Sequence, residues 1–172
     1  MQKPWRHYLE ETMSIETVKA YFQSRGIKPR IIEFDSSSAT VALAAEALGV
    51  SPARIAKSLS FWVGGRPALV VAAGDAKVDN KKFRDAFSCK ATMLSAEETE
   101  RHVGHAVGGV CPFAILPEVQ VYLDRSLARF DSVYPACGSD NSCVELTLAE
   151  LEELSENVAG WVDVCRLRDL EP

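Results

Sequence analysis

The sequence predicts a single α+β domain, and three observations support this class. The 172 residues are enough for one hydrophobic core, and 47% hydrophobic with 25% charged residues is typical of a globular protein. Segments with the two-residue period of a strand alternate with segments of helical period. No apolar run reaches the ~20 residues that span a bilayer, and the first residues lack the apolar centre of a secretory signal. We therefore expect a soluble protein with no membrane partner.

The first helix is expected to begin after Ser14, which can cap it, and to end near Arg25, before a glycine. Met13 directly precedes this helix start. We therefore expect residues 1–12 to be an N-terminal extension and residues 13–168 to form the domain.

Local rules predict the later elements in order. Helices are expected where a capping residue precedes an apolar stripe, and strands where β-branched and aromatic residues alternate. The predicted helices are 40–48 before Gly49, a short turn at Ser51-Pro52, 80–87 capped by Asp79, and 95–103 and 147–155 with capping boxes. The predicted strands are 30–34, 55–63, 68–73, 90–94, 119–124, 132–134, 143–146 and 161–165.

Residues 54–75 predict a central β-hairpin, because Gly64-Gly65 can turn the chain with positive φ angles. Its second strand, 68–73, is apolar throughout, which is typical of a strand covered on both faces. The first strand alternates. One face carries Ile55, Lys57, Leu59, Phe61 and Val63, and the other carries Ala56, Ser58, Ser60 and Trp62.

Lys57 does not fit this pattern, because its ammonium is in phase with four large apolar side chains. An unpaired ammonium in the core would cost several kcal/mol or lose its proton. In one interpretation, Lys57 extends its apolar stem past the sheet edge into solvent. In the other, it lies in a cleft and meets a phosphate or carbonyl oxygen.

Cysteine usage and charge exclude several classes of function. The five cysteines are odd in number and never spaced as CxxC, which argues against a disulfide framework or a thiolate zinc site and for a reducing cytoplasm. A net charge of −5 argues against a nonspecific nucleic-acid coat and against DNA as a partner. A local group of cations remains, and it indicates either a solvated helix face or a phosphate-contacting patch. Its members are Lys77, Lys81, Lys82 and Arg84.

Two loops rich in small residues, 107–113 and 135–142, are either plain turns or binding loops with exposed amides. Within the first, Cys111 has no catalytic partner placed by the sequence, which favours a packed thiol over a nucleophile. His102 and His105 form an HxxH without a third nearby ligand, so surface histidines are favoured over a metal site. Common nucleotide-binding, esterase and HExxH zinc motifs are absent.

Four segments resemble, in matching order, the YbaK/ProX family of aminoacyl-tRNA editing domains, which are akin to the editing insertion of bacterial prolyl-tRNA synthetase. The segments are Ser38–Gly49, Ile55–Leu59, Gly74-Asp75 with Val78-Asp79, and Gly108–Phe113. The resemblance covers about residues 14–166 and is greatest to freestanding ProX-type proteins that clear small amino acids from tRNA(Pro). It implies a strongly twisted mixed β-sheet, or partial barrel, wrapped by helices around a cleft for the aminoacylated 3′ end.

The resemblance also implies the site. Lys57 matches the family's essential lysine, residues 108–112 match its GxxxP loop, and residues 138–142 take the place of a third pocket wall. The implied catalytic residues are Lys57 and the backbone of Gly108, Gly109, Val110 and Cys111. The implied substrate-binding residues are Thr40, Ser58, Pro112, Phe113, Gly138, Ser139 and Asn141, and the implied tRNA-binding residues are Lys77, Lys81, Lys82 and Arg84.

The implied reaction is hydrolysis of the ester that joins a wrong amino acid to the terminal ribose of a mischarged tRNA, without cofactor or metal. Lys57 would bind phosphate or polarise the carbonyl, amides of the glycine loop would stabilise the oxyanion, and a ribose hydroxyl would assist the attacking water. Cys-specific members carry Gly-Lys-Arg-Gly-Leu-Asp where this chain has Gly138-Ser-Asp-Asn-Ser-Cys143. That departure favours alanine, 2-aminobutyrate, serine or threonine over cysteine as substrate.

Prolyl-tRNA synthetase and an elongation factor are candidate transient partners besides the tRNA acceptor end. Two alternative functions stay open. One is a noncatalytic module that binds tRNA or a synthetase, and the other is a metal-dependent hydrolase that uses His102 and His105.

Overall fold

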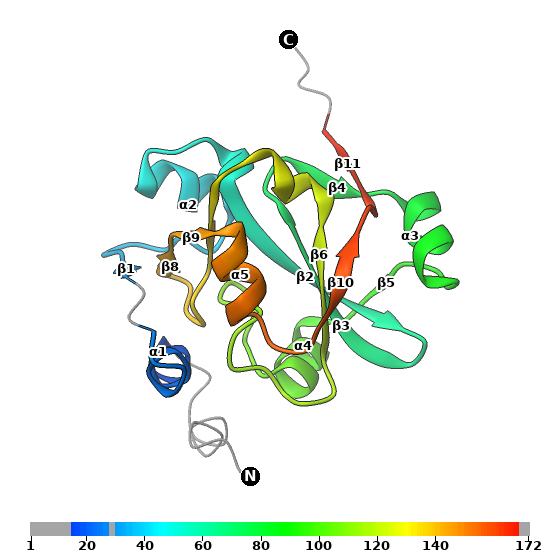
Figure 1. The fold of residues 1–172 in the computed structure, drawn as a ribbon, viewed down its shortest axis with the longest axis horizontal. Coiled ribbons are helices and arrows are strands. Elements are labelled where there is room, and N and C mark those ends of the chain that lie inside the picture. The colour runs from blue at the N-terminus through cyan, green and yellow to red at the C-terminus, as the bar shows by residue number, and fades with distance from the viewer. Residues whose placement is uncertain (1–14, 28–29, 169–172) are drawn as a thin grey trace.

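The computed structural model describes residues 15–27 and 30–168 and shows one curled mixed β-sheet with helices packed around it (Figure 1). This confirms the predicted α+β class and the partial barrel. The predicted extension 1–12 and the predicted cap Ser14 lie outside the described residues. Within those residues, no helix is both long and apolar enough to cross a membrane.

Helices begin and end close to the predicted positions. Thr40 caps one helix by accepting the Leu43 N–H, and Gly49 ends it in the left-handed region (φ 68°). The helices are α1 Ile15–Ser24, α2 Val41–Leu48, α3 Asn80–Phe87, α4 Ala96–Val103 and α5 Leu148–Leu154, with short 3-10 turns η2 Pro52–Arg54 and η3 Arg125–Arg129. Both predicted capping boxes are present, at the starts of α4 and α5.

The main sheet has the strand order β10-β6-β3-β2-β7-β9, with β5 also paired to β2. Its central pair is the predicted hairpin, and Gly64 and Gly65 turn it with φ of 58° and 77°. The sheet is mixed, because β3 runs parallel to β6 and β2 runs parallel to β7. Its strands are β2 Ile55–Val63, β3 Arg66–Ala73, β5 Thr92–Met93, β6 Gln120–Asp124, β7 Ser132–Pro135, β9 Leu146–Thr147 and β10 Val158–Val162.

Two short antiparallel ladders stand beside the main sheet. One joins β1 Ile31–Glu33 to β8 Ser142–Val144, and the other joins β4 Ala76–Val78 to β11 Cys165–Leu167. Each ladder pairs segments that are roughly 90 to 110 residues apart in the sequence, so each ties the last third of the chain to its first half.

Strand β2 has the two faces that its alternation predicts. On one face Phe61 is buried against Phe83 of α3, with ring centroids 4.9 Å apart. On the other, Ser60 shares a 2.9 Å hydrogen bond with Thr99 of α4, and Trp62 packs edge-on against a histidine of α4. Strand β3 is buried from Ala68 to Ala73, which confirms its predicted cover on both faces.

The structure corrects two predicted strands. The predicted strand 143–146 is two strands, β8 and β9, which belong to different ladders and are separated by Glu145. The Glu145 carboxylate accepts hydrogen bonds from the hydroxyl groups of Tyr134 and Ser132, so the side chain of this residue is bonded to strand β7. The predicted strand 161–165 is likewise divided between β10 and β11, at the point where the Val164 N–H donates to the Asp124 carboxylate (2.9 Å).

Candidate functional site

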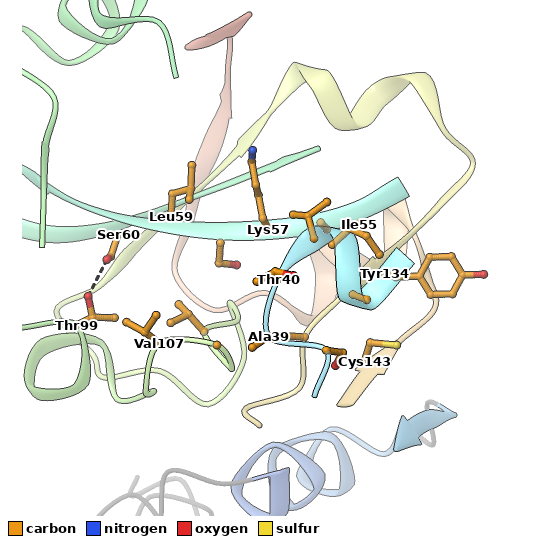
Figure 2. Close-up of a pocket in the computed structure, with 18 of the residues that line it drawn as sticks. Ala39, Thr40, Ile55, Lys57, Leu59, Ser60, Thr99, Val107, Tyr134 and Cys143 are labelled. Carbon is orange, nitrogen blue, oxygen red and sulfur yellow. Dashed lines mark hydrogen bonds between the residues drawn. The ribbon is translucent and has the colours of Figure 1, made fainter. Parts of the chain in front are cut away.

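A cavity of about 310 Å³ lies beside β2, where the start of α2, the loop 107–110 and strands β7 and β8 come together (Figure 2). Its walls are mostly apolar, with a few hydroxyl groups among them. Among the residues that line it are Ala39, Thr40, Ser58, Ser60, Thr99, Val107, Gly108, Val110, Tyr134, Ser142 and Cys143. Such a volume and lining suit a small ligand with few polar groups.

The cavity coincides with a gap in the sheet. On the edge of β2 that faces away from β3, Ile55 and Ala56 pair with β7, and Phe61 and Trp62 pair with β5. Residues 57–60 lie between these two pairings. The Ser60 carbonyl faces this edge, because it accepts the N–H of Leu94 (3.1 Å). Backbone groups alternate in direction along a strand, so the N–H and C=O of Ser58 face the same edge.

Ser58 also brings an unsatisfied side chain to the cavity. Its hydroxyl oxygen is buried and has no hydrogen-bond partner among the described residues. The neighbouring hydroxyl on the same face, that of Ser60, is bonded to Thr99. Buried polar groups are normally paired, and an unpaired one at a cavity wall indicates a place for a ligand or water. Ser58 thus presents a hydroxyl, an N–H and a C=O at one point of the wall.

The two predicted glycine loops meet backbone to backbone. The Gly138 N–H donates to the Gly109 carbonyl (3.1 Å), and a Cβ at residue 109 would lie 2.6 Å from the Gly138 carbonyl carbon. Gly108 adopts φ 102°, which a residue with a side chain rarely does. From the first loop, Val107, Gly108 and Val110 line the cavity. The contact therefore fixes one wall of the cavity against another.

Several residues predicted for this wall lie elsewhere. Cys111 and Phe113 are fully buried in the core, where the Phe113 ring packs 4.9 Å from that of Phe22. Gly109 and Pro112 do not line the cavity, and the Gly109 N–H donates to the Ala106 carbonyl (3.1 Å), so it is not a free oxyanion donor. Burial raises the pKa of Cys111 to about 12, which fits the predicted packed thiol. The apolar residues of the loop anchor it in the core.

In the second loop, the polar side chains bond to one another or to neighbouring backbone and not toward the cavity. Ser139 bonds to Asn141 (2.9 Å) and to Ser142 (2.6 Å), and the Asn141 side chain donates to the Phe34 carbonyl (3.0 Å). Gly138, Ser139 and Asn141 thus hold the loop in place and do not line the cavity. Its contribution to the wall is Ala136 and Ser142, and Cys143 follows directly in β8. Sequence reasoning missed Cys143, Tyr134 and Thr99, because only the tertiary fold brings them to Ser58.

Lys57 lines the cavity, yet its ammonium is turned to the other side of β2. Figure 2 shows its side chain leaving the strand opposite Ser60 and Val107. The ammonium donates to the carbonyls of Ala76 and, at 3.4 Å, Gly74, and burial followed by the charge of Arg168 lowers its pKa. The residue is half-buried and its ammonium meets carbonyl oxygens and not bulk solvent, which is the contact that the second interpretation of Lys57 expected.

The predicted cations of α3 are partly neutralised. Lys81 pairs with Asp85 (2.9 Å), while Lys82 pairs with Asp163 (3.0 Å) and donates to the Cys165 carbonyl (2.9 Å). Arg84 is exposed on α3, and Lys77 lies on β4, beside a separate hollow. The four residues do not form one surface around the cavity.

The cavity offers binding groups and no evident proton-transfer group. Among the described residues that line it, none is an aspartate, glutamate or histidine. The thiol of Cys143 has its pKa raised to about 12 by burial, so it is not a thiolate at neutral pH. Within the described residues, no group of three histidine, cysteine or acidic side chains is arranged to hold a metal. His102 packs on Trp62, while His105 is buried and bonded to the Phe113 carbonyl (2.6 Å).

Comparison with known proteins identifies the class. A model of the aminoacyl-tRNA editing domain matches residues 35–154. The match covers most of the chain and contains the cavity, so this protein belongs to the aminoacyl-tRNA editing domain family. The resemblance inferred from the four segments is therefore confirmed.

Individual relatives agree with this family. The chain is 52% identical over 155 residues to the uncharacterized protein YwhH of Bacillus subtilis, covering 90% of this chain and 98% of that one. It is 28% identical over 146 residues to a proline–tRNA ligase of Geobacillus thermodenitrificans, covering 76% of this chain but only 25% of the ligase. An Enterococcus faecalis relative named "Putative Cys-tRNA(Pro)/Cys-tRNA(Cys) deacylase EbsC" is 29% identical over 105 residues, covering 59% of this chain and 63% of that one.

Solved structures show the same fold. The hypothetical protein APE2540 superposes with a TM-score of 0.77 at 30% identity, over 87% of this chain and 99% of that one. A structure described as a "putative trans-editing enzyme for prolyl tRNA synthetase" gives a TM-score of 0.78 at 24% identity, over 96% and 99% of the two chains. The curled sheet and its helices are thus shared with both of these solved structures.

Gly109→Ala is expected to destabilise the domain by about 1–3 kcal/mol, because the new Cβ would overlap the backbone of Gly138 and Ser139, which cannot rotate away. Urea denaturation followed by circular dichroism measures this loss. The matched control is Gly64→Ala, which meets no atom within 4 Å and carries only the cost of its positive φ. An equal or smaller loss for Gly109→Ala would contradict the close contact of the two loops.

Proposed function

We propose that this protein is a trans-editing aminoacyl-tRNA deacylase that hydrolyses the ester of a small noncognate amino acid on mischarged tRNA, with tRNA(Pro) as the preferred carrier. The observation that carries the proposal is the small cavity at the gap of β2, with Ser58 on its wall, in a chain of the aminoacyl-tRNA editing family. Two of the similar proteins are named for prolyl-tRNA synthetase and for Cys-tRNA(Pro), and these names support the choice of tRNA. We place this activity in the cytoplasm, where tRNA is charged.

The character of the cavity wall supports a small substrate side chain. Val107, Val110 and Cys143 give the wall an apolar surface, and the loop contact at Gly109 keeps that wall from moving outward. Excluding a ring by shape is easier than separating two ligands that differ by one methylene, which is worth only about 1–3 kcal/mol. We therefore propose alanine, 2-aminobutyrate, serine and threonine as the class of cleared amino acids, with proline excluded.

In the proposed reaction, the oxygen of a water molecule attacks the ester carbonyl, the bond from that carbon to the ribose oxygen breaks, and the ribose oxygen takes a proton. The products are the free amino acid and tRNA with its terminal hydroxyl restored. The cavity lining holds no carboxylate or imidazole, and the Cys143 thiol is protonated, so we assign activation of the water to the neighbouring ribose hydroxyl. The protein's part is to hold the ester and to exclude wrong side chains.

A deacylation panel tests the proposal directly. tRNA(Pro) charged with alanine, 2-aminobutyrate, serine, threonine, cysteine or proline is incubated with the purified protein, and the remaining aminoacyl-tRNA is measured over time. We expect turnover of at least one of the first four esters and none of prolyl-tRNA. Tight tRNA binding without turnover of any ester would instead identify a noncatalytic binding module.

We propose that the Lys57 ammonium binds a phosphate next to the esterified ribose. Lys57→Ala is therefore expected to lower kcat/KM for the preferred ester by about 10- to 100-fold, the effect of losing one hydrogen bond from a charged group to that phosphate. The fold should survive, because the loss of the ammonium's hydrogen bonds to the Gly74 and Ala76 carbonyls is partly offset by removal of a charge that burial disfavours. Thermal unfolding near neutral pH should therefore show only a small loss of stability. Lys90→Ala, which removes an exposed lysine, is the control, and full activity of Lys57→Ala would remove this residue from the mechanism.

Ser58→Ala is expected to lower kcat/KM by about 3- to 10-fold without lowering stability, because the hydroxyl it removes has no partner in the described residues. Ser60→Ala provides the contrast, since it leaves the buried Thr99 hydroxyl without its side-chain partner and should lower the melting temperature. If Ser58→Ala lost stability and kept full activity, the hydroxyl would be part of the packing and not of the site.

A further inference from the structure

Like charges face each other across the ladder of β4 and β11. Lys77 and Arg166 are directly opposite in the register, and both side chains are exposed. The ladder continues with Arg168, whose N–H donates to the Asp75 carbonyl (2.9 Å). Like charges at directly opposite positions destabilise an antiparallel pair. This arrangement therefore costs stability, which a bound anion would recover.

A hollow of about 270 Å³ lies over this pair of strands. It is lined by Lys77, Arg166, Leu167 and Arg168, so three of its four residues are cations. We call Lys77, Arg166 and Arg168 the β4–β11 patch. The patch is concentrated positive charge on a chain whose net charge is −5.

The patch keeps its charge, unlike Lys81 and Lys82 of α3. Within the described residues, no ion pair joins Lys77, Arg166 or Arg168 to a carboxylate. The charge of Arg166 contributes to lowering the pKa of Asp79, but the Asp79 carboxylate accepts the backbone N–H groups that begin α3. The patch is thus free to meet a ligand.

Lys57 connects the patch to the cavity. Its ammonium donates to the carbonyls of Gly74, just before β4, and of Ala76, the first residue of β4. The charge of Arg168 contributes to lowering the pKa of Lys57. Close by, Arg129 holds the Asp75 carboxylate with two hydrogen bonds of 2.6 and 3.0 Å, so this carboxylate does not neutralise the patch. Lys57 therefore lies at the end of the patch and at the wall of the cavity.

We propose that the β4–β11 patch binds backbone phosphates of the RNA whose aminoacylated end enters the cavity. This inference rests on the proposed function for the choice of RNA as the anion. Arginine presents a planar fork of donors that matches a phosphate, and a run of such cations follows a chain of phosphates. The patch takes the place of α3 as the main phosphate-binding surface, with Lys77 the one residue common to both sets.

The test is the double variant Lys77→Gln/Arg166→Gln, which removes the facing charges. Binding of uncharged tRNA is measured by fluorescence anisotropy over a series of salt concentrations. We expect affinity to fall at least about tenfold near 0.1 M salt. We also expect the negative slope of log K against log salt to become shallower by about 1–2, as for the loss of two phosphate contacts. The melting temperature should stay equal or rise, because the variant relieves a repulsion.

Two matched double variants complete the design. Arg66→Gln/Arg101→Gln removes the same charge from exposed positions on β3 and α4 and should leave tRNA affinity within about twofold of the wild type. Lys81→Gln/Arg84→Gln tests α3 and should weaken binding less than the patch variant does. An α3 variant with the larger effect, or equal losses in all three variants, would overturn the inference.

The result is independent of whether the protein deacylates tRNA, since the probe is uncharged. If no ester in the panel is hydrolysed but the patch variant still loses tRNA affinity and salt dependence, the proposed function fails and the RNA-binding patch stands. If esters are hydrolysed while the patch variant binds tRNA like the wild type, the patch inference fails and the function stands.

Discussion

The site depends on one constraint, which is that β2 is paired along its whole length on one edge and only at its two ends on the other. Strand β3 holds β2 from Ala56 to Val63, so the strand stays rigid where β7 and β5 leave it uncovered. A buried strand edge would normally carry a cost for each unpaired backbone group. Here the uncovered stretch forms the wall of a cavity, and Ser58, whose buried hydroxyl has no hydrogen-bond partner among the described residues, lines that wall.

The walls opposite β2 are held by glycine. Gly109 and Gly138 approach so closely that a Cβ on the first would overlap the backbone of the second, and a hydrogen bond of 3.1 Å joins them. Behind this contact, Cys111 and Phe113 anchor the first loop in the core. The glycines therefore allow the two loops to approach closely, and the buried residues of the first loop hold it against the core.

Local chemistry explains which features the sequence predicts well. The end of a helix at Gly49, the cap at Asp79 and the Gly64-Gly65 turn depend on a few adjacent residues, and each forms where predicted. The position of Lys57 in the strand alternation is also local, and its ammonium meets carbonyl oxygens, as one of the two interpretations expected.

Tertiary context explains the rest. No local pattern brings Tyr134 and Cys143 to the cavity, or pairs Lys77 with a residue almost ninety positions later. Phe113 does not lie in the wall as predicted, because residues of a glycine-containing loop can still face the core. Family resemblance identifies the loop but does not determine which of its side chains face the ligand.

Strand β2 borders two different surroundings because its successive side chains point to opposite faces. Side chains of adjacent residues leave a strand on opposite faces, so Lys57 and Ser58 reach different surroundings from one point of the chain. On one side stand the carbonyls of Gly74 and Ala76 and then the cations of the β4–β11 patch, and on the other stands the apolar cavity. A ligand that is highly charged along its length and small and apolar at its end matches this pair of surfaces. An aminoacylated RNA end has that form, so the alternation of a single strand can separate recognition of the phosphates from selection of the amino acid.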